Sequence, residues 1–382
     1  MRIEHPRTAP ESLMDETMAC LHAPDDLADR AIAAAGGARR RHGHTHRLAT
    51  VAGLALAASL AFGGTAYAVV NSLFFVQAYG DHGLGASKTW SMTGDDGTSV
   101  YSYKQSYQTI ADDDVTQAIE DATEPVNLSA SANGYTLTIE SMVLDANGAG
   151  AATFTLTSSD AFKLVDSGVG SELVFDQDSN LNSIGMDFSS GDFGDSLDSS
   201  VHYDIDTSTN TELHGTMYFN SKGLDSFDGG ITWKLQGFSG GDRETGTPFE
   251  ASTGTFKPSK VVGAKSYADD TGNTASLSPL SLKVGYRLGE ARHSYSAYSV
   301  LLNQADGTQQ PIIKNMYQEG ETAETNYYVY YGWESDGTAY EILSLTQATN
   351  PDVIENITLE GKAHFKDGRP SEPYSYTLLP VE

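Results

Sequence analysis

Apolar and polar residues alternate along most of the chain, which is typical of strands with one buried face. In residues 135–145, for example, Tyr135, Leu137 and Ile139 alternate with polar residues. The same period recurs over 152–157, 213–219, 231–238, 280–288, 295–302, 326–333, 339–345, 354–365 and 373–379. Short strands at this spacing, with few helices between them, predict a mainly β fold. We expect two antiparallel β-sandwich-like domains in tandem, over 126–250 and 251–382.

The segment before these strands is polar and rich in Gly and Ser, and predicts a stalk over 76–125. One helix is expected within it. The stretch ADDDVTQAIEDATEPV begins at Ala111, and Pro125 ends its helical pattern because proline disfavours helix at the residue before it.

An apolar segment separates this β-rich part from the N-terminus. No charged residue occurs from Leu48 to Gly80. The most apolar part, Leu48 to Val70, spans about 34 Å as a helix at ~1.5 Å per residue, enough for a hydrocarbon core of ~30 Å. Basic juxtamembrane residues precede it, namely Arg39, Arg40, Arg41 and Arg47. Because positive charge favours the cytoplasmic side, we expect a transmembrane helix over 48–75, a cytoplasmic N-terminus and an extracytoplasmic C-terminal bulk.

A cleaved export signal is the alternative interpretation of this segment. Ala66-Tyr67-Ala68 fits the small-residue pattern of a cleavage site. Such a leader would reach Ala68, whereas ordinary signals take about 15–30 residues. Apolar residues also continue beyond the cut, as far as Phe75. We therefore expect the segment to stay in membrane lipid, with cleavage as the competing possibility.

Residues 1–47 carry helix signals that a signal peptide does not need. In APDDLADRAIAAAGG, Pro24 and the acids after it suit a helix start, and the glycine pair ends the helix. Leu27, Ala31 and Ile32 lie on or beside one face. A helix of about a dozen residues is marginal alone in water, so we expect this cytoplasmic head to bind a partner through that face. A tail without structure, which only sets the topology, is the alternative.

Charge and cysteine content narrow the classes of function. The chain has 23 Lys and Arg against 51 Asp and Glu, a formal net charge of −28. The two signs balance up to Phe75, so the acidic excess lies beyond the apolar segment and disfavours direct binding of nucleic acid. The one cysteine, Cys20, excludes an intramolecular disulfide. The neighbouring histidines, which we expect to extend the basic cluster, are His42, His44 and His46.

The stretch EPVNLSASANGYTLTIESMVLDANG resembles an uncharacterised family of Gram-positive membrane proteins. Those proteins have a short cytoplasmic head, one span and an extracytoplasmic β domain of unknown function. The shared pattern is an Asn-Gly turn, an apolar strand and a second strand ending in Asp, here Asn133-Gly134 and Asp145. LSPLSLKVGY, with Ser278-Pro279-Leu280, looks like the second β domain that often follows. The resemblance implies an anti-sigma-factor-like regulator with a cytoplasmic sigma factor as partner, and it supplies no catalytic residues.

Two short motifs partly match the sequence patterns of a nucleophile elbow and of a calcium-binding loop, but each lacks a required feature. Gly237 to Gly241 fits G-x-S-x-G around Ser239, but no helical pattern follows the strand, as a nucleophile elbow requires. Asp176 to Asp187 imitates a calcium loop, but Leu181 occupies the position where the sharp turn needs glycine. Weak calcium binding by the acidic residues 187–198 stays a possibility beside a solvated loop.

Histidines and tyrosines provide the remaining candidates. The histidines of the β-rich part that have no Cys or acid at metal-ligand spacing are His202, His214, His293 and His364. A glycan- or peptide-binding face is conceivable at Tyr327, Tyr328, Tyr330 and Tyr331, although alternate tyrosines of a strand more often pack one face and shield the other.

We therefore predict no catalytic residue, cofactor or metal ligand, and we do not expect an enzyme. The leading hypothesis is a single-pass signalling regulator with an unknown extracellular ligand. The alternative is a passive cell-surface or adhesive protein.

Overall fold

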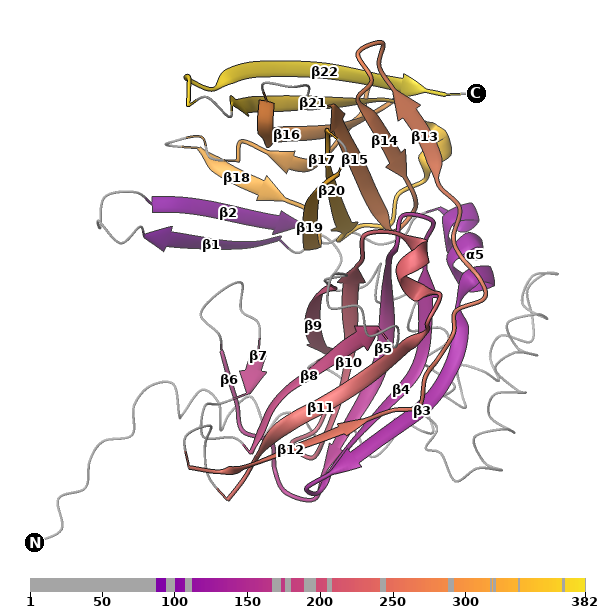
Figure 1. Ribbon diagram of the computed structural model, residues 1–382, viewed down its shortest axis with the longest axis vertical. Coiled ribbons are helices and arrows are strands. Elements are labelled where there is room, and N and C mark those ends of the chain that lie inside the picture. Colours follow the sequence, from indigo (N-terminus) through magenta and orange to yellow (C-terminus); the bar gives the residue numbers. More distant parts are fainter. Residues whose placement is uncertain are drawn as a thin grey trace, which may run out of the picture.

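The computed structural model describes residues 87–93, 100–106, 112–166, 173–175, 180–188, 197–204, 208–240, 245–287, 292–316, 318, 321–335, 337–365 and 368–381. Strands dominate this part of the chain and pair almost entirely antiparallel, which confirms the mainly β prediction. They form two β units, one above the other in Figure 1. Within the described residues no helix is long and apolar enough to cross a membrane. The expected span over 48–75 and the expected head over 1–47 lie outside them.

The first unit consists of two packed sheets. The larger sheet has the order β3 (Glu124–Ala132), β4 (Tyr135–Leu144), β5 (Ala149–Ser158), β10 (Glu212–Asn220) and β9 (Asp198–Asp204). The smaller sheet has the order β12 (Thr247–Ser252), β11 (Ile231–Ser239) and β8 (Leu181–Phe188). A separate hairpin consists of β6 (Leu164–Asp166) and β7 (Leu173–Phe175), and a short 3₁₀ helix is η2 (Leu224–Phe227).

The core of the first unit lies between these sheets, and the alternating pattern predicted which side chains enter it. The predicted inward residues that are almost fully buried are Leu137, Ile139, Ala152, Phe154, Leu156, Ile231, Trp233 and Leu235. Strand side chains point alternately to opposite faces, so the polar residues between them lie on the outer faces.

The second unit is one twelve-stranded sheet that curls almost fully round on itself. Its strands follow the order β1 (Ser87–Thr93), β2 (Val100–Ser106), β18 (Thr322–Thr325), β17 (Gln309–Lys314), β16 (Arg292–Gln304), β21 (Ile354–Phe365), β22 (Glu372–Pro380), β13 (Lys265–Ala268), β14 (Thr274–Leu277), β15 (Ser281–Arg287), β20 (Thr338–Leu345) and β19 (Tyr327–Ser335). A short 3₁₀ helix, η3 (Pro351–Val353), precedes β21. One apolar core inside the curl joins Leu282 and Val284 with Leu302 and Leu359 from the opposite side.

The segment expected to be a stalk contributes to this large sheet. β1 and β2 form a hairpin, and β2 pairs in parallel with β18 from Ser102↔Thr322 to Lys104↔Glu324 (Figure 1). The helix expected after them is α5 (Asp113–Ala122), whose first turn is capped by the Asp112 carboxylate. The whole first unit is therefore inserted between β2 and β13 of the second.

An aromatic ring lies over a glycine on the neighbouring strand at five places. The directly opposed pairs are Phe219 with Gly150, Phe154 with Gly215, Phe249 with Gly237, Tyr340 with Gly285 and Tyr374 with Gly361. The ring covers backbone that the missing side chain would leave exposed, so each pair stabilises its sheet through glycine's small size.

Gly150→Ala is expected to lower the free energy of unfolding by ~1–3 kcal/mol. The added Cβ would lie 2.2 Å from the Val143 carbonyl oxygen and 2.6 Å from Phe219 Cζ. Gly185→Ala is the matched control, because nothing lies within 4 Å of a Cβ on that strand glycine. Urea unfolding of both variants tests this, and an equal loss in both would contradict it.

Candidate functional site

A half-buried polar cluster on the outer face of the larger first-unit sheet combines the chemistry that a site requires. Thr155 of β5 and His214 of β10 are directly opposed across neighbouring strands, beside β4. The register of β4 against β5 shifts between Ile139 and Ser141, which leaves Glu140 as the extra residue of a bulge. We call Glu140, Thr155, Glu212 and His214 the His214 cluster.

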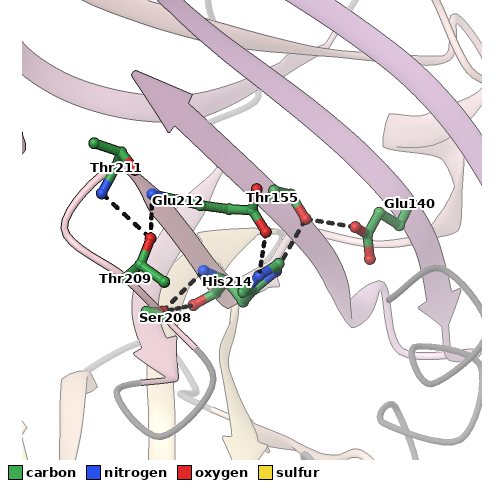
Figure 2. Close-up of polar contacts among 7 residues, drawn as sticks. All are labelled: Glu140, Thr155, Ser208, Thr209, Thr211, Glu212 and His214. Carbon is green, nitrogen blue, oxygen red and sulfur yellow. Dashed lines mark hydrogen bonds and ion pairs between the residues drawn. The ribbon is translucent and has the colours of Figure 1, made fainter. Parts of the chain in front are cut away.

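Hydrogen bonds run in one line through the His214 cluster (Figure 2). Thr155 Oγ1 lies 2.5 Å from Glu140 Oε1 and 3.1 Å from His214 Nδ1. The other ring nitrogen, His214 Nε2, lies 3.0 Å from Glu212 Oε1. The imidazole thus has a hydroxyl on one side and a carboxylate on the other.

The loop before β10 fixes the backbone of this cluster (Figure 2). The His214 amide donates to Ser208 Oγ at 3.0 Å, and the Glu212 amide donates to Thr209 Oγ1 at 3.0 Å. Short hydroxyl side chains satisfy nearby backbone donors in this way at the start of strands and helices. His214 and Glu212 therefore leave the loop with defined positions on the same strand face.

Burial decides where the protons of the cluster reside. It raises the pKa of Glu140 to about 7, the Thr155 hydrogen bond opposes this effect, and the charge of Glu212 adds to it. The second oxygen, Glu140 Oε2, is buried and has no hydrogen-bond partner in the described part of the chain. A buried acceptor of this kind favours the neutral carboxyl, because ionisation would leave charge without compensation.

The two protonation states of Glu140 require different arrangements of the neighbouring protons. A neutral Glu140 donates to Thr155, Thr155 donates to His214 Nδ1, and His214 Nε2–H donates to Glu212. When Glu140 ionises, Thr155 donates to it, and His214 then has to donate from both ring nitrogens, from Nδ1–H to Thr155 and from Nε2–H to Glu212. Loss of one proton from Glu140 is thereby coupled to the gain of a proton by the imidazole.

The order hydroxyl, imidazole, carboxylate matches that of hydrolase triads, but the surroundings differ. His214 is only 3% exposed, and the Thr155 hydroxyl already interacts with Glu140 on its other side. A nucleophile needs an approach for substrate and donors for an oxyanion.

Thr155→Val is expected to lower the free energy of unfolding by ~1–3 kcal/mol, because it leaves Glu140 and His214 Nδ1 without the hydroxyl between them. Thr157→Val is the matched control, since Thr157 points to the same face two residues further along β5. Chemical denaturation at pH 7 measures both. A smaller loss in Thr155→Val than in the control would show that the cluster contributes nothing.

A second buried polar network joins the two β units. The carboxylate of Asp145, at the end of β4, accepts from the Ala149 amide at 2.9 Å and from the Ser281 hydroxyl at 2.5 Å. It also accepts from the Asn147 amide and from the Ser278 hydroxyl. Asp145 and Ser278, which belong to the two sequence patterns of the family resemblance, are thus in direct contact.

Apolar side chains surround this network and form a shared core at the junction. Those from the first unit and α5 are Val115, Ile119, Ala122, Val143, Ala151 and Tyr218, and those after β12 are Val262, Leu280, Val329 and Ala348. Tyr218 stacks on Tyr328 with ring centroids 3.9 Å apart. Asn220 Nδ2 donates to the Val329 and Ile342 carbonyls at 2.8 and 3.0 Å. The two units are therefore packed as one body.

Two of the remaining candidate histidines, His202 and His364, are partners of hydroxyl groups, whereas the His293 side chain lies outside the described part. His202 Nε2 lies 2.9 Å from Ser200 Oγ, and His364 lies between two serine hydroxyls at 2.8 Å. The described residues contain no group of three acids, histidines or cysteines that could hold a metal ion. The sequence pattern was considered only for metal ligands, so the pairing of His214 with Glu212 was not predicted. Glu212 is two residues away, a spacing that places both side chains on one face of a strand.

The two imitated motifs are described only in part, since residues 176–179 and 189–196 lie outside the described residues. Ser239 is the last residue of β11. The next described element is β12, a strand that pairs antiparallel with β11, and not the helix that a nucleophile elbow requires. Asp187 forms an ion pair with Lys234 at 2.7 Å. Among the tyrosines of β19, Tyr328 stacks at the junction and Tyr330 contacts Glu341.

The residues predicted for the membrane and the cytoplasm lie outside the described residues. They are Leu48 and Val70 at the ends of the span, the basic residues Arg39, Arg40, Arg41 and Arg47, and the partner face Leu27, Ala31 and Ile32.

Comparison with known proteins gives limited information. No family model and no curated protein matches the chain. It is similar to a solved structure described as that of a conserved domain protein from Bacillus anthracis, with 10% identity and a TM-score of 0.37. That match covers 69% of this chain and 93% of the other. A likeness of this strength indicates no function.

Proposed function

We propose that the chain is a single-pass, anti-sigma-factor-like regulator of the membrane. In this proposal residues 48–75 form the span, the head over 1–47 binds a cytoplasmic sigma factor, and the β units lie outside the cell and bind a ligand. The observation that carries it is the junction, where Asp145, Ser278 and Ser281 share a fully buried network between the units.

A rigid body suits signalling because binding at one place can bias the position of the whole body. Packed elements with defined arrangements couple binding at one site to the position of another site. Domains joined by flexible linkers lack this coupling. Only residues 76–86 separate the expected end of the span from β1. A change in the outer body would therefore act close to the membrane. A passive adhesive protein has no need of such coupling.

The test uses the full-length protein in cells of its own source. The variant with Leu27→Asp and Ile32→Asp places charge on the expected partner face, and Ala33→Asp adds charge to the same helix off that face. We expect the first variant to lose co-purification of a sigma factor and to change a defined set of transcripts, while Ala33→Asp behaves as the unaltered protein. Unchanged transcripts in both, with normal surface exposure, would favour the passive surface protein.

The topology is tested separately by N-terminal sequencing of the mature protein. The proposal requires the membrane fraction to contain a chain that retains residues before Leu48. A mature chain that begins at Val69 and is free in the medium would show that Ala66-Tyr67-Ala68 is cleaved, and would exclude the anchor.

A further inference from the structure

Glu341 is a carboxylate inside the curled sheet of the second unit. It lies on β20 directly opposite Val284 of β15, on the face whose neighbours Leu282 and Leu343 enter the core. Tyr286 Oη donates to Glu341 Oε2 at 3.3 Å, and Tyr330 Oη donates to Oε1 at 3.1 Å. Each oxygen is thus held by one phenol hydroxyl.

This carboxylate has no counter-charge in the described part of the chain. The ion pairs there join other residues, and no Lys, Arg or His nitrogen lies within 4 Å of Glu341. Burial raises the pKa of Glu341 to about 7, against the two tyrosine hydrogen bonds. Glu341 is half-buried, and a carboxylate without a cation beside an apolar core costs free energy that a structural role does not require, because an apolar residue of similar size would pack there.

Aromatic rings surround the same position. Tyr286 stacks on Tyr295 with centroids 4.6 Å apart, and Tyr374 meets Tyr295 edge-on at 5.1 Å. The Tyr374 side chain is 8% exposed, and its buried hydroxyl lies next to the Tyr286 hydroxyl. Burial raises the pKa of Tyr374, and the charge of Glu341 adds to this effect, so the Tyr374 hydroxyl lies close to the carboxylate.

The cluster borders solvent at Tyr330. This side chain is 43% exposed and belongs to β19, the end strand of the sheet (Figure 1). A Cβ at Gly332 would lie 2.8 Å from Tyr330 Oη, so the glycine leaves the space in which the phenol rests. Rotation of this one exposed side chain would uncover Glu341 Oε1.

We propose that Glu341, Tyr286, Tyr330 and Tyr374 form a binding site for an alkylammonium group. The ammonium donates to the carboxylate and to the Tyr374 phenol oxygen, and the ring faces attract its positive charge. The acidic excess of the chain beyond Phe75 raises the local concentration of such cations. Polyamines and lysine side chains share this chemistry. The site rests only on residues of the second unit, and it holds whether or not the head binds a sigma factor.

Binding of the cation is coupled to a proton. The ammonium prefers the ionised carboxylate, so it displaces the proton that Glu341 holds below about pH 7. We expect close to one proton to be released per cation bound at pH 6, and close to none at pH 8.5. As pH increases toward 7, the affinity for the ammonium is expected to increase about tenfold per pH unit. Above pH 7 the affinity is expected to stay constant.

The experiment is calorimetric titration of the full-length protein in detergent with butylammonium, spermidine and a lysine-containing tripeptide. Buffers of different ionisation enthalpy report the released proton. Butanol is the uncharged control ligand, and we expect no binding of it. Glu341→Gln is expected to weaken ammonium binding at least tenfold, whereas Glu140→Gln, which changes the other buried glutamate, leaves it unaltered. The tighter of spermidine and the tripeptide identifies the source of the ammonium group.

Equal binding of butanol, undiminished binding by Glu341→Gln or an equal loss in Glu140→Gln would overturn the proposal. So would the lack of binding of all three amines at pH 8.5. The proton release is measured on the unaltered protein, so the proposal stays testable even if Glu341→Gln does not fold. Release of no proton at pH 6 during ammonium binding would exclude Glu341 as the site.

Discussion

Asp145→Ala is expected to lower the free energy of unfolding by ~3–5 kcal/mol, the largest effect of a single substitution that we anticipate. The carboxylate is fully buried and accepts from two backbone amides and two serine hydroxyls. Its removal leaves these donors without an acceptor at the junction, and each unpaired buried group costs ~1–3 kcal/mol. Urea unfolding, followed by circular dichroism, measures the loss.

Asp269→Ala provides a closely matched control. The Asp269 carboxylate accepts from the backbone amides of Thr271 and Asn273 and from both of their side chains, but it lies in the partly exposed hairpin between β13 and β14. Water can replace it there, so we expect a loss of about 1 kcal/mol or less. Equal losses in the two variants would mean that the junction does not stabilise the protein beyond local turn bonds.

The free energy of unfolding is expected to fall as pH rises from 5 to 8. Burial raises the pKa of Glu140 and of Glu341 to about 7, whereas the unfolded chain has ordinary values near 4.5. A raised pKa in the folded state means that folding favours the protonated form. The stability is therefore complete below the unfolded value and is lost as pH rises through the folded one. At ~1.36 kcal/mol per pKa unit, each group contributes roughly 3 kcal/mol at most.

The double variant Glu140→Gln, Glu341→Gln tests this pH dependence. A neutral amide cannot ionise, so the variant is expected to lose most of the decline between pH 5 and pH 8 and to exceed the unaltered protein in stability at pH 8. Glu355→Gln changes an exposed glutamate and is expected to keep the original profile. Urea midpoints at pH 5, 6, 7 and 8 decide the question, and a profile of the double variant parallel to the original would contradict the assignment.

The sequence predicted the faces of the strands well, because alternation reflects burial directly. Leu137, Ile139, Trp233 and Leu235 are inward as expected. It did not predict β1, β2 or β3, because β1 and β2 lie in a segment that is rich in Gly and Ser overall and β3 contains Pro125 and Asn127. Partners far away in the chain stabilise β2, and this tertiary contribution is invisible in a local pattern.

The polar clusters around His214 and Glu341 were not predicted from the sequence, for a different reason. Glu140 reads as an ordinary outward residue of an alternating strand, and only the bulge places it beside Thr155. A single sequence does not reveal a register shift. The pair Glu212 and His214 was detectable in principle, since a spacing of two on a strand is as informative as a spacing of four on a helix. Glu341, in an apolar strand, carried the same signal of a charged residue at a core position.

The insertion of the first unit into the second sets the order in which the protein can be completed. β2 is made early, but its parallel partner β18 follows the entire first unit, and β22, near the C-terminus, is needed to link β21 with β13. The first unit can close while the chain is still emerging. The curled sheet, by contrast, can be completed only after β22 has been synthesised. Pairings between strands so far apart in the sequence also form slowly. During that interval the early hairpin exposes an unpaired edge, so assembly is expected to require a chaperone or rapid synthesis of the remaining strands.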